Sequence, residues 1–234
     1  MAVSVAGYST NQPQTSLPSL APSSILSRLR METRDEHNAV EQVLDLMSPS
    51  LTRDGYLQRL AQFYGFYAPL ENALKRRGER QNGERHLSSD TRLALALRLN
   101  KTALLQLDLQ HLGVDTDNLA LCRNLPPLET QADVLGCLYV MEGATLGGRL
   151  ITQHIRTTLG ITPATGGRFF DGYGDDTGAM WHGMRELLVN SAPDTDTQNA
   201  MVSSAIATFS GLRRWCESSQ KQKQQATSET NHHA

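Results

Sequence analysis

Cysteine is scarce in this 234-residue chain, and its three copies are far apart in the sequence. Cys122, Cys137 and Cys216 form neither a CxxC pair nor a CxxCH motif, so zinc sites built on paired cysteines and the c-type cytochromes are excluded. Dispersed thiols without a pairing framework indicate a reducing compartment. We therefore expect a cytoplasmic protein whose cysteines are free.

The chain also lacks a charge excess, a secretory signal and a long apolar run. With 22 basic and 24 acidic residues, its formal charge of -2 gives no electrostatic footprint for a nucleic acid or an anionic membrane. The N-terminal segment lacks the basic start and the apolar stretch of a signal peptide. No later window of the sequence reaches the roughly 18 apolar residues that are required to span a bilayer. We expect a soluble protein without nucleic-acid or membrane partners.

Several catalytic signatures are absent as well. The sequence has no GxSxG nucleophile elbow, no P-loop and no dinucleotide-binding glycine motif, which argues against ordinary hydrolases and phosphoryl-transfer enzymes. The repeated Glu-x-x-His motifs of a helical di-iron site are also missing. His86, His111, His154 and His182 have no histidine or cysteine neighbour at metal-ligand spacing, and we interpret them as structural.

Apolar residues at helical spacing fill the middle of the chain, and strand-like alternation is rare, which predicts an all-α fold. One domain is the default at this length, and we place a multi-helix bundle at residues 23–217. Residues 1–22 and 218–234 are polar segments that we expect to be disordered tails. Helices are expected at about residues 24–47, 52–77, 90–112, 130–159, 177–190 and 196–216.

Local signals mark the ends of some of these helices. Thr130 and Asp133 resemble a capping box at the start of the fourth helix, and Gly160 is placed to end it. The glycine-rich segment 160–176 is predicted to be a loop. Pro69 should bend the second helix, because its ring removes one hydrogen bond.

The first predicted helix carries a polar strip beside its apolar stripe. Four polar residues at offsets of 0, 4, 7 and 11 fall within about 60° of one another at 100° per residue; they are Arg30, Arg34, His37 and Glu41. Such a strip suits a planar, apolar, dianionic ligand, with imidazole binding a central metal and guanidinium groups binding carboxylates. The alternative is a half-buried histidine beside surface arginines that make i,i+4 contacts. This helix alone does not decide between them.

The fourth predicted helix contains three glycines, Gly143, Gly147 and Gly148. Each glycine costs roughly 0.5–1 kcal/mol relative to alanine inside a helix. Either another helix packs closely against this face, or a flat ligand lies over the exposed backbone. Both interpretations remain open from the sequence.

Two motifs in this order resemble a known family. LRMETRDEHNAVE, which contains His37, and LYVMEGATLGGR, about a hundred residues later, are similar to the first-helix and distal-helix motifs of the biliverdin-producing heme oxygenases. The resemblance continues through LTRDGYLQRLAQFYGFYAPLE, GRFFDGYG and MWHGMRELL, and covers most of residues 26–216. It is strongest for the bacterial and bacteriophytochrome-associated branch. It implies heme held between a proximal helix and a kinked, glycine-rich distal helix.

The resemblance assigns roles on the proximal side and at the rim of the heme. It implies that His37 ligates the heme iron and that Arg30 and Arg34 contact the heme propionates. Arg185 is a further candidate rim cation. Glu41, one turn after His37, is expected either to tune the imidazole through a direct or water-mediated bond or to face solvent.

On the distal side, the resemblance places Gly143, Gly147 and Gly148 against the heme face, with Gly143 and Gly147 at the site of oxygen activation. Animal-type members carry an aspartate after the first of these glycines, whereas this chain has Ala144. That departure puts the source of the distal proton relay in doubt.

The implied reaction converts heme, which is both cofactor and substrate, to biliverdin, carbon monoxide and ferrous iron. It requires O2 and an external electron donor, such as a ferredoxin or a flavoprotein reductase. A bilin-accepting phytochrome is a further partner that the resemblance implies. Two other functions compete with this one: a heme-binding or carrier protein without catalysis, and a heme-free helical-bundle enzyme of the thiaminase-like or di-metal kind.

Overall fold

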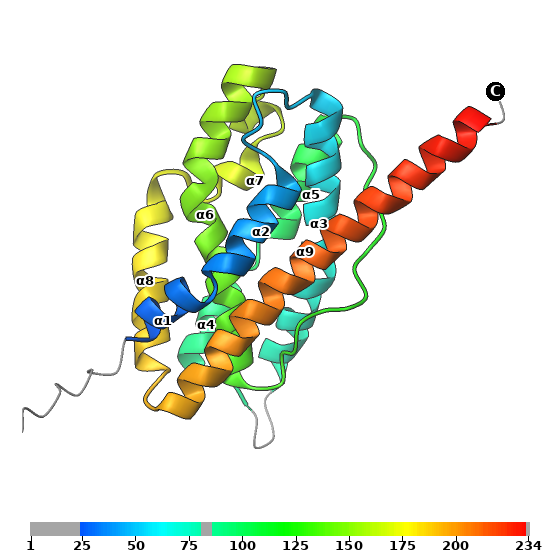
Figure 1. Cartoon of the computed structure of the whole chain (residues 1–234). Helices are drawn as coiled ribbons and strands as arrows, with labels where there is room; N and C mark the ends of the chain where they lie inside the picture. Colours follow the sequence, from blue (N-terminus) through cyan, green and yellow to red (C-terminus); the bar gives the residue numbers. More distant parts are fainter. Residues whose placement is uncertain (1–23, 81–85, 233–234) are drawn as a thin grey trace, which may run out of the picture.

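The computed structural model describes residues 24–80 and 86–232, with side chains as far as Ser219. Within these ranges the chain is helical and contains no β-strand, as the all-α prediction requires (Figure 1). The α-helices are α1 Ile25–Glu32, α2 Arg34–Leu44, α3 Arg53–Glu79, α4 Ser89–Arg98, α5 Lys101–His111, α6 Gln131–Leu159, α7 Arg168–Asp171, α8 Thr177–Asn190 and α9 Thr195–His232. The predicted N-terminal tail, residues 1–22, lies outside the described residues.

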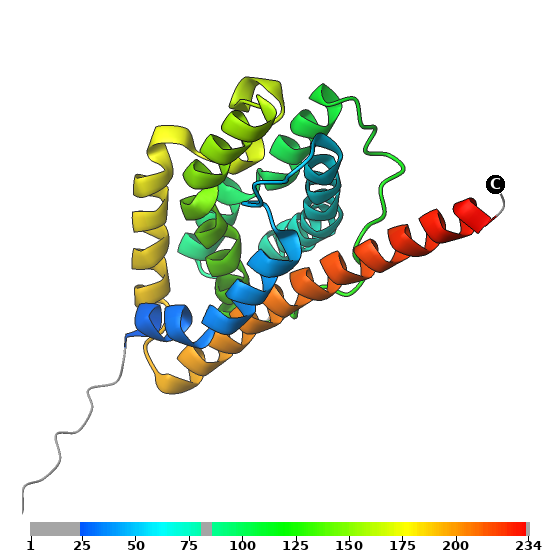
Figure 2. The same ribbon diagram turned by 45° about the horizontal axis from the view of Figure 1, so that its top comes forward.

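The expected first helix is broken into α1 and α2 at Thr33. The Thr33 hydroxyl donates a hydrogen bond of 2.7 Å to the carbonyl oxygen of Leu29, one turn back, and its side chain is buried there. Figure 2 shows α2 leaving α1 at an angle. The four-residue polar strip is therefore divided, because Arg30 belongs to α1 and does not share the register of α2.

The expected third helix is also two helices, α4 and α5. A buried carboxylate from α3 separates them: Glu71 accepts hydrogen bonds from the backbone nitrogens of Lys101 (2.7 Å) and Thr102 (3.2 Å). These bonds satisfy the first backbone N–H groups of α5. In a continuous helix, those groups would instead bond to carbonyl oxygens of the preceding turn. The prediction of one helix over residues 90–112 was wrong because the capping group comes from a distant part of the chain.

Other local predictions are confirmed. In the Thr130–Asp133 capping box, the backbone nitrogens of Thr130 and Asp133 each donate to the other side chain, at 2.8 and 3.1 Å. Gly160 ends α6 with a φ of +70°. The α8 boundaries coincide with the predicted range 177–190. Pro69 lies inside α3, which continues through it, and the bend expected there stays a prediction.

The C-terminal helix α9 is longer than expected. It continues to His232, whereas the sequence predicts a helix that ends near residue 216 and a disordered polar tail. Glutamine, lysine and alanine are good helix formers, and adding a residue to an existing helix is far easier than starting one. In Figures 1 and 2 this last part of α9 projects beyond the rest of the bundle.

Helix α6 is the central core helix, and α4, α7, α8 and α9 pack around it. It contains an 18-residue stretch with a mean hydropathy of 1.3, which by length and composition would also allow it to cross a membrane. Half of that stretch is buried inside the fold, which is typical of a core helix.

The predicted loop over residues 160–176 is ordered by a buried aspartate. Asp108 of α5 accepts hydrogen bonds from the backbone nitrogens of Arg168 (2.9 Å) and Phe169 (2.8 Å), which start the short helix α7. This helix places Phe169 and Phe170 in the core, where Phe169 lies 5.1 Å from the ring of Phe63 on α3. The two phenylalanines form one end of the pocket described next.

Candidate functional site

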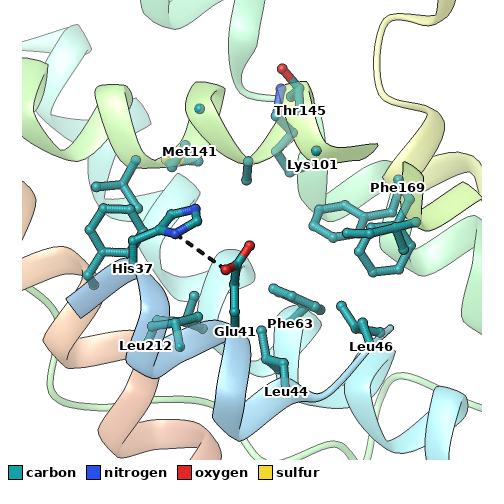
Figure 3. Close-up of a pocket in the computed structure, with 18 of the residues that line it drawn as sticks. His37, Glu41, Leu44, Leu46, Phe63, Lys101, Met141, Thr145, Phe169 and Leu212 are labelled. Carbon is teal, nitrogen blue, oxygen red and sulfur yellow. Dashed lines mark ion pairs between the residues drawn. The ribbon is translucent and has the colours of Figure 1, made fainter. Parts of the chain in front are cut away.

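A largely apolar pocket of about 370 Å³ lies between α2 and α6. Side chains of α3, α7 and α9 close its remaining sides, and Figure 3 shows their arrangement. Phe63 and Phe169 lie at one end, and Leu212 lies near His37 at the other. The apolar lining favours a hydrophobic ligand with a small number of polar attachment points.

His37 of α2 projects its imidazole into this pocket (Figure 3). Its Nδ1 lies 3.7 Å from Oε2 of Glu41, one helical turn away, and its ring meets the ring of Phe209 edge-on at 5.5 Å. A separation of 3.7 Å is longer than a direct hydrogen bond, so a water or a small side-chain movement would complete the link. With Nδ1 directed to a carboxylate, Nε2 is left for a ligand in the pocket.

On the opposite wall, α6 presents Gly143 and Gly147 to the pocket. A Cβ added to either glycine would meet no atom within 4 Å, so each lies beside open space. The two residues are four positions apart and share one helix face. Backbone therefore forms part of the pocket wall directly opposite the side from which His37 enters.

Gly148 has a different role from the other two glycines. A Cβ at this position would overlap the carbonyl oxygen of Phe170, and Gly148 is absent from the pocket lining. The prediction that Gly148 contacts the ligand is corrected: it allows α7 to pack against α6. The close-packing interpretation of the glycine cluster is therefore confirmed at Gly148, and the open space beside Gly143 and Gly147 leaves room for the flat ligand of the other interpretation.

The predicted rim arginines lie outside the pocket lining. Arg34 is exposed on α2, where its Nε lies 3.7 Å from Oδ1 of Asp35. Arg30 on α1 and Arg185 on α8 are exposed as well. Their assignment to the ligand rim stays a prediction, which would require their side chains to reach groups that extend from the pocket.

A buried ionic cluster beside the pocket was missed by the sequence analysis. The Nζ of Lys101 donates to Oε1 of Glu142 at 2.9 Å and to the hydroxyl of Tyr173 at 2.8 Å. The Tyr173 hydroxyl in turn donates to Oε1 of Glu142 at 2.9 Å, and Nε of Arg98 lies 3.4 Å from Oε2. Lys101 is 2% exposed and Glu142 is 1% exposed.

Burial governs the ionisation of this cluster. It lowers the pKa of Lys101 from its ordinary value, and the neighbouring Glu142 carboxylate opposes that shift. Burial and the same carboxylate both raise the pKa of Tyr173. One sequence signal points to the cluster: Glu142 interrupts the apolar run LYVMEG, and a carboxylate on a buried helix face requires a cation.

A hydrogen bond also links the two sides of the pocket. Nε2 of His154, on α6, lies 2.9 Å from the carbonyl oxygen of Ser48, in the segment that follows α2. His154 thus has a structural contact, as the sequence analysis proposed.

In the described part of the chain, no three His, Cys, Asp or Glu side chains converge on a metal site.

Comparison with known proteins gives a consistent result. A family model described as heme oxygenase matches residues 23–218. The structure is similar to the NO- and CO-bound heme oxygenase of Neisseria meningitidis, with a TM-score of 0.67 and 18% identity over 84% of this chain and 92% of that chain. It is also similar to heme oxygenase 2 of Chlamydomonas reinhardtii, solved without heme, with a TM-score of 0.65 and 17% identity over 83% and 96% of the two chains. No curated protein sequence matches the chain.

The structural matches have low sequence identity and support the fold, whereas the family model covers most of the chain. The chain belongs to the heme oxygenase family, whose members are enzymes that use heme as substrate together with O2.

Proposed function

We propose that the chain binds heme in the α2–α6 pocket through His37 and opens the heme ring to give biliverdin, carbon monoxide and ferrous iron. The observation that carries this proposal is the opposition of His37 to Gly143 and Gly147 across one apolar pocket. An imidazole on one side and bare backbone on the other suit a flat ligand with a central metal.

The residues of the pocket fit heme in shape and chemistry. The volume of about 370 Å³ lies in the range of roughly 300–1,000 Å³ that is usual for small-molecule and cofactor sites. Gly143 and Gly147 leave the space that side chains would fill, so a planar ligand can approach the α6 backbone. Most other lining side chains are apolar, as the macrocycle requires.

The proximal residues would then orient the axial ligand. Bound heme supplies the iron at which O2 is activated and the macrocycle that is oxidised. Glu41, at 3.7 Å from Nδ1, favours the tautomer of His37 that leaves Nε2 unprotonated for the iron. Imidazole, unlike a thiolate ligand, gives little push towards cleavage of the O–O bond, which suits oxidation of the macrocycle itself.

The three predicted rim arginines are proposed to bind the heme propionates. Arg30 and Arg34 both precede His37, by seven and three positions, and Arg185 lies on α8, which packs against α1. The contact between Arg34 and Asp35 is exposed and long, so releasing it costs little.

The branch of the family, the electron donor, the acceptor of the bilin and the cellular location are also proposals. Similarity to the bacterial and bacteriophytochrome-associated motifs supports that branch, a ferredoxin or flavoprotein reductase as electron donor, and a phytochrome as acceptor of the bilin. A cytoplasmic location is supported by the three cysteines, which are all free and buried in the structure.

The His37→Ala variant provides the direct test of heme ligation. We expect heme to give a Soret band with the wild-type protein, a loss of the native spectrum in His37→Ala, and partial restoration by added imidazole. His182→Ala is the matched control, because His182 is also paired with a glutamate one turn away but lies outside the pocket lining. No change in the spectrum of His37→Ala would contradict the proposal.

Catalysis requires a second measurement. With a reductant and O2, the heme complex should lose its Soret band and form biliverdin. A stable Soret band under these conditions would indicate a heme carrier. The absence of any Soret band in the wild-type protein would favour a heme-free enzyme.

A further inference from the structure

The buried ionic cluster of Lys101, Glu142, Tyr173 and Arg98 is called the Lys101 cluster below. It places an ionisable group on the side of the pocket that Gly143 and Gly147 form, the glycine side. Five ionisable residues line the pocket in the described structure. Three come from α2 and its C-terminal end, one comes from α3 and one comes from α5; they are His37, Glu41, Asp45, Tyr67 and Lys101. Lys101 donates a hydrogen bond to Glu142 of α6, and it is the charged residue of this lining on the side opposite His37 (Figure 3).

The reaction of O2 in the proposed function consumes protons on the glycine side of the pocket. Insertion of one oxygen atom of O2 into a C–H bond, with loss of the other as water, follows R–H + O2 + 2e⁻ + 2H⁺ → R–OH + H2O. The electrons come from the external donor of the proposed function. The protons have to enter an apolar pocket, and at position 144 the chain offers only a methyl group.

We propose that Lys101 is the proton donor on the glycine side of the pocket, and that Glu142 and Tyr173 position and reload it. The proposal rests on the proposed function and extends it to the residues that supply protons. The proton leaves the Lys101 ammonium through water in the pocket and ends on oxygen, and the neutral amine then recovers a proton from the Tyr173 side.

The hydrogen bonds of Lys101 fit this role. Two of its three N–H groups have short contacts, to Glu142 and Tyr173. Its remaining contacts, to the Arg98 carbonyl oxygen and Oδ1 of Asn100, are long at 3.5 and 3.4 Å. One N–H is thus weakly held and able to turn towards water in the pocket.

Tyr173 provides the path for reloading. It is partly buried, and its hydroxyl contacts Lys101 and both carboxylate oxygens of Glu142. A hydroxyl accepts and donates at once, so a proton can pass through it between solvent and the buried amine. The cluster therefore runs from the partly exposed segment between α7 and α8 to the pocket wall.

The charges around Lys101 balance, which keeps the buried cluster stable. Arg98 on α4 and Lys101 carry positive charges, and Glu142 on α6 and Glu71 on α3 carry negative charges. Burial lowers the pKa of Lys101, which makes its proton easier to release than that of an exposed lysine. Of the four residues of the cluster, Lys101 is the one that lines the pocket.

The test compares Lys101→Met, Glu142→Gln and Tyr173→Phe with Lys75→Met, a control at an exposed lysine of α3. Each heme complex is first titrated by its Soret band. We expect Lys101→Met to bind heme like the wild type but to form biliverdin at least tenfold more slowly, a loss in keeping with removal of a general acid. Tyr173→Phe should slow the reaction less, and Lys75→Met should not change it.

The C–O stretching frequency of the ferrous CO complex gives a readout that is independent of turnover. Positive charge near the oxygen of CO lowers this frequency, because it favours electron donation from iron into the antibonding orbital. Lys101→Met should therefore raise the frequency and Glu142→Gln should lower it. A cluster whose charges do not reach the bound ligand would leave both frequencies unchanged, and looser packing alone would shift both variants in the same direction.

The outcomes separate this inference from the proposed function. If Lys101→Met keeps the Soret band, the biliverdin rate and the C–O frequency of the wild type, the inference is overturned and the proposed function stands. C–O frequencies that shift in the same direction in Lys101→Met and Glu142→Gln would also overturn the inference. A wild-type protein that binds no heme would overturn the proposed function, and this inference with it.

Discussion

Gly148 of α6 lies against the carbonyl oxygen of Phe170 in α7, so closely that a Cβ on Gly148 would overlap this atom. The contact fixes α7 on the core helix and thereby places Phe169 and Phe170 at the end of the pocket. The backbone of Phe170 cannot move away easily, because Asp108 holds the start of α7 by two hydrogen bonds. Gly148 is therefore a requirement of the fold.

Gly148→Ala is expected to destabilise the protein. Overpacking against backbone costs about 1–3 kcal/mol, and the better helix propensity of alanine recovers roughly 0.5–1 kcal/mol of that. The middle of these ranges leaves a net loss of about 1 kcal/mol, which for a domain of this size lowers the melting temperature by about 2–4 °C. Calorimetry of the heme-free protein measures it, and an unchanged melting temperature would contradict the packing role.

Gly147→Ala is expected to have the opposite effect on stability and a separate effect on heme. The added methyl group meets no atom within 4 Å, so the heme-free protein should gain about 0.5–1 kcal/mol from helix propensity. The same methyl group enters the space of the ligand, and heme affinity should fall roughly tenfold or more. Soret titration and calorimetry test both effects on one variant, with Gly148→Ala as the comparison.

Local signals in the sequence were sufficient for several elements of the fold. The Thr130–Asp133 capping box and the Gly160 stop depend on residues a few positions apart, and both are found as predicted. The helical spacing of α8 is likewise a local property. For the site, the sequence placed His37, Gly143 and Gly147 on the two helices that the structure brings together around one pocket.

The remaining features depend on contacts between distant segments. The break before α5 is made by Glu71, which lies thirty positions before Lys101. The partner of Gly148 is a backbone atom of another helix. Lys101 looks like an ordinary polar residue of an amphipathic helix until Glu142 and Tyr173 are placed beside it. Helical periodicity reports which face is apolar, but not which buried polar group meets which partner.

The buried thiol of Cys137 predicts how stability depends on pH. Burial raises the pKa of Cys137 from 9.0 to about 12. Because the folded pKa is raised, the thiol contributes stability fully below pH 9 and loses it as pH rises towards 12. Between pH 8 and 10.5 the loss is about 2 kcal/mol, since the unfolded chain ionises first.

Comparison with Cys137→Ala isolates this contribution from other groups that titrate in the same range. The difference in unfolding free energy between wild type and Cys137→Ala should shrink by about 2 kcal/mol over that interval. Urea unfolding at a series of pH values measures it. A difference that stays constant with pH would show that the thiol ionises as easily in the folded protein as in the unfolded chain.

The His37–Glu41 pair leads to a prediction about the heme itself. Oε2 of Glu41 lies 3.7 Å from Nδ1 of His37, and a carboxylate that accepts from Nδ1 makes an iron-bound imidazole a stronger electron donor. A stronger donor stabilises ferric iron relative to ferrous iron. Glu41→Gln should therefore raise the reduction potential of the heme complex, while this exposed pair contributes little to folding stability.

Spectroelectrochemistry of the heme complex measures the potential, and Glu186→Gln is the matched control. Glu186 lies 3.5 Å from His182 in the same one-turn arrangement, but neither residue lines the pocket. A rise in Glu41→Gln alone identifies Glu41 as the partner of the axial histidine. Equal potentials in both variants and in the wild type would instead assign Glu41 to solvent, because a carboxylate bonded to Nδ1 cannot be neutralised without weakening the imidazole as a donor.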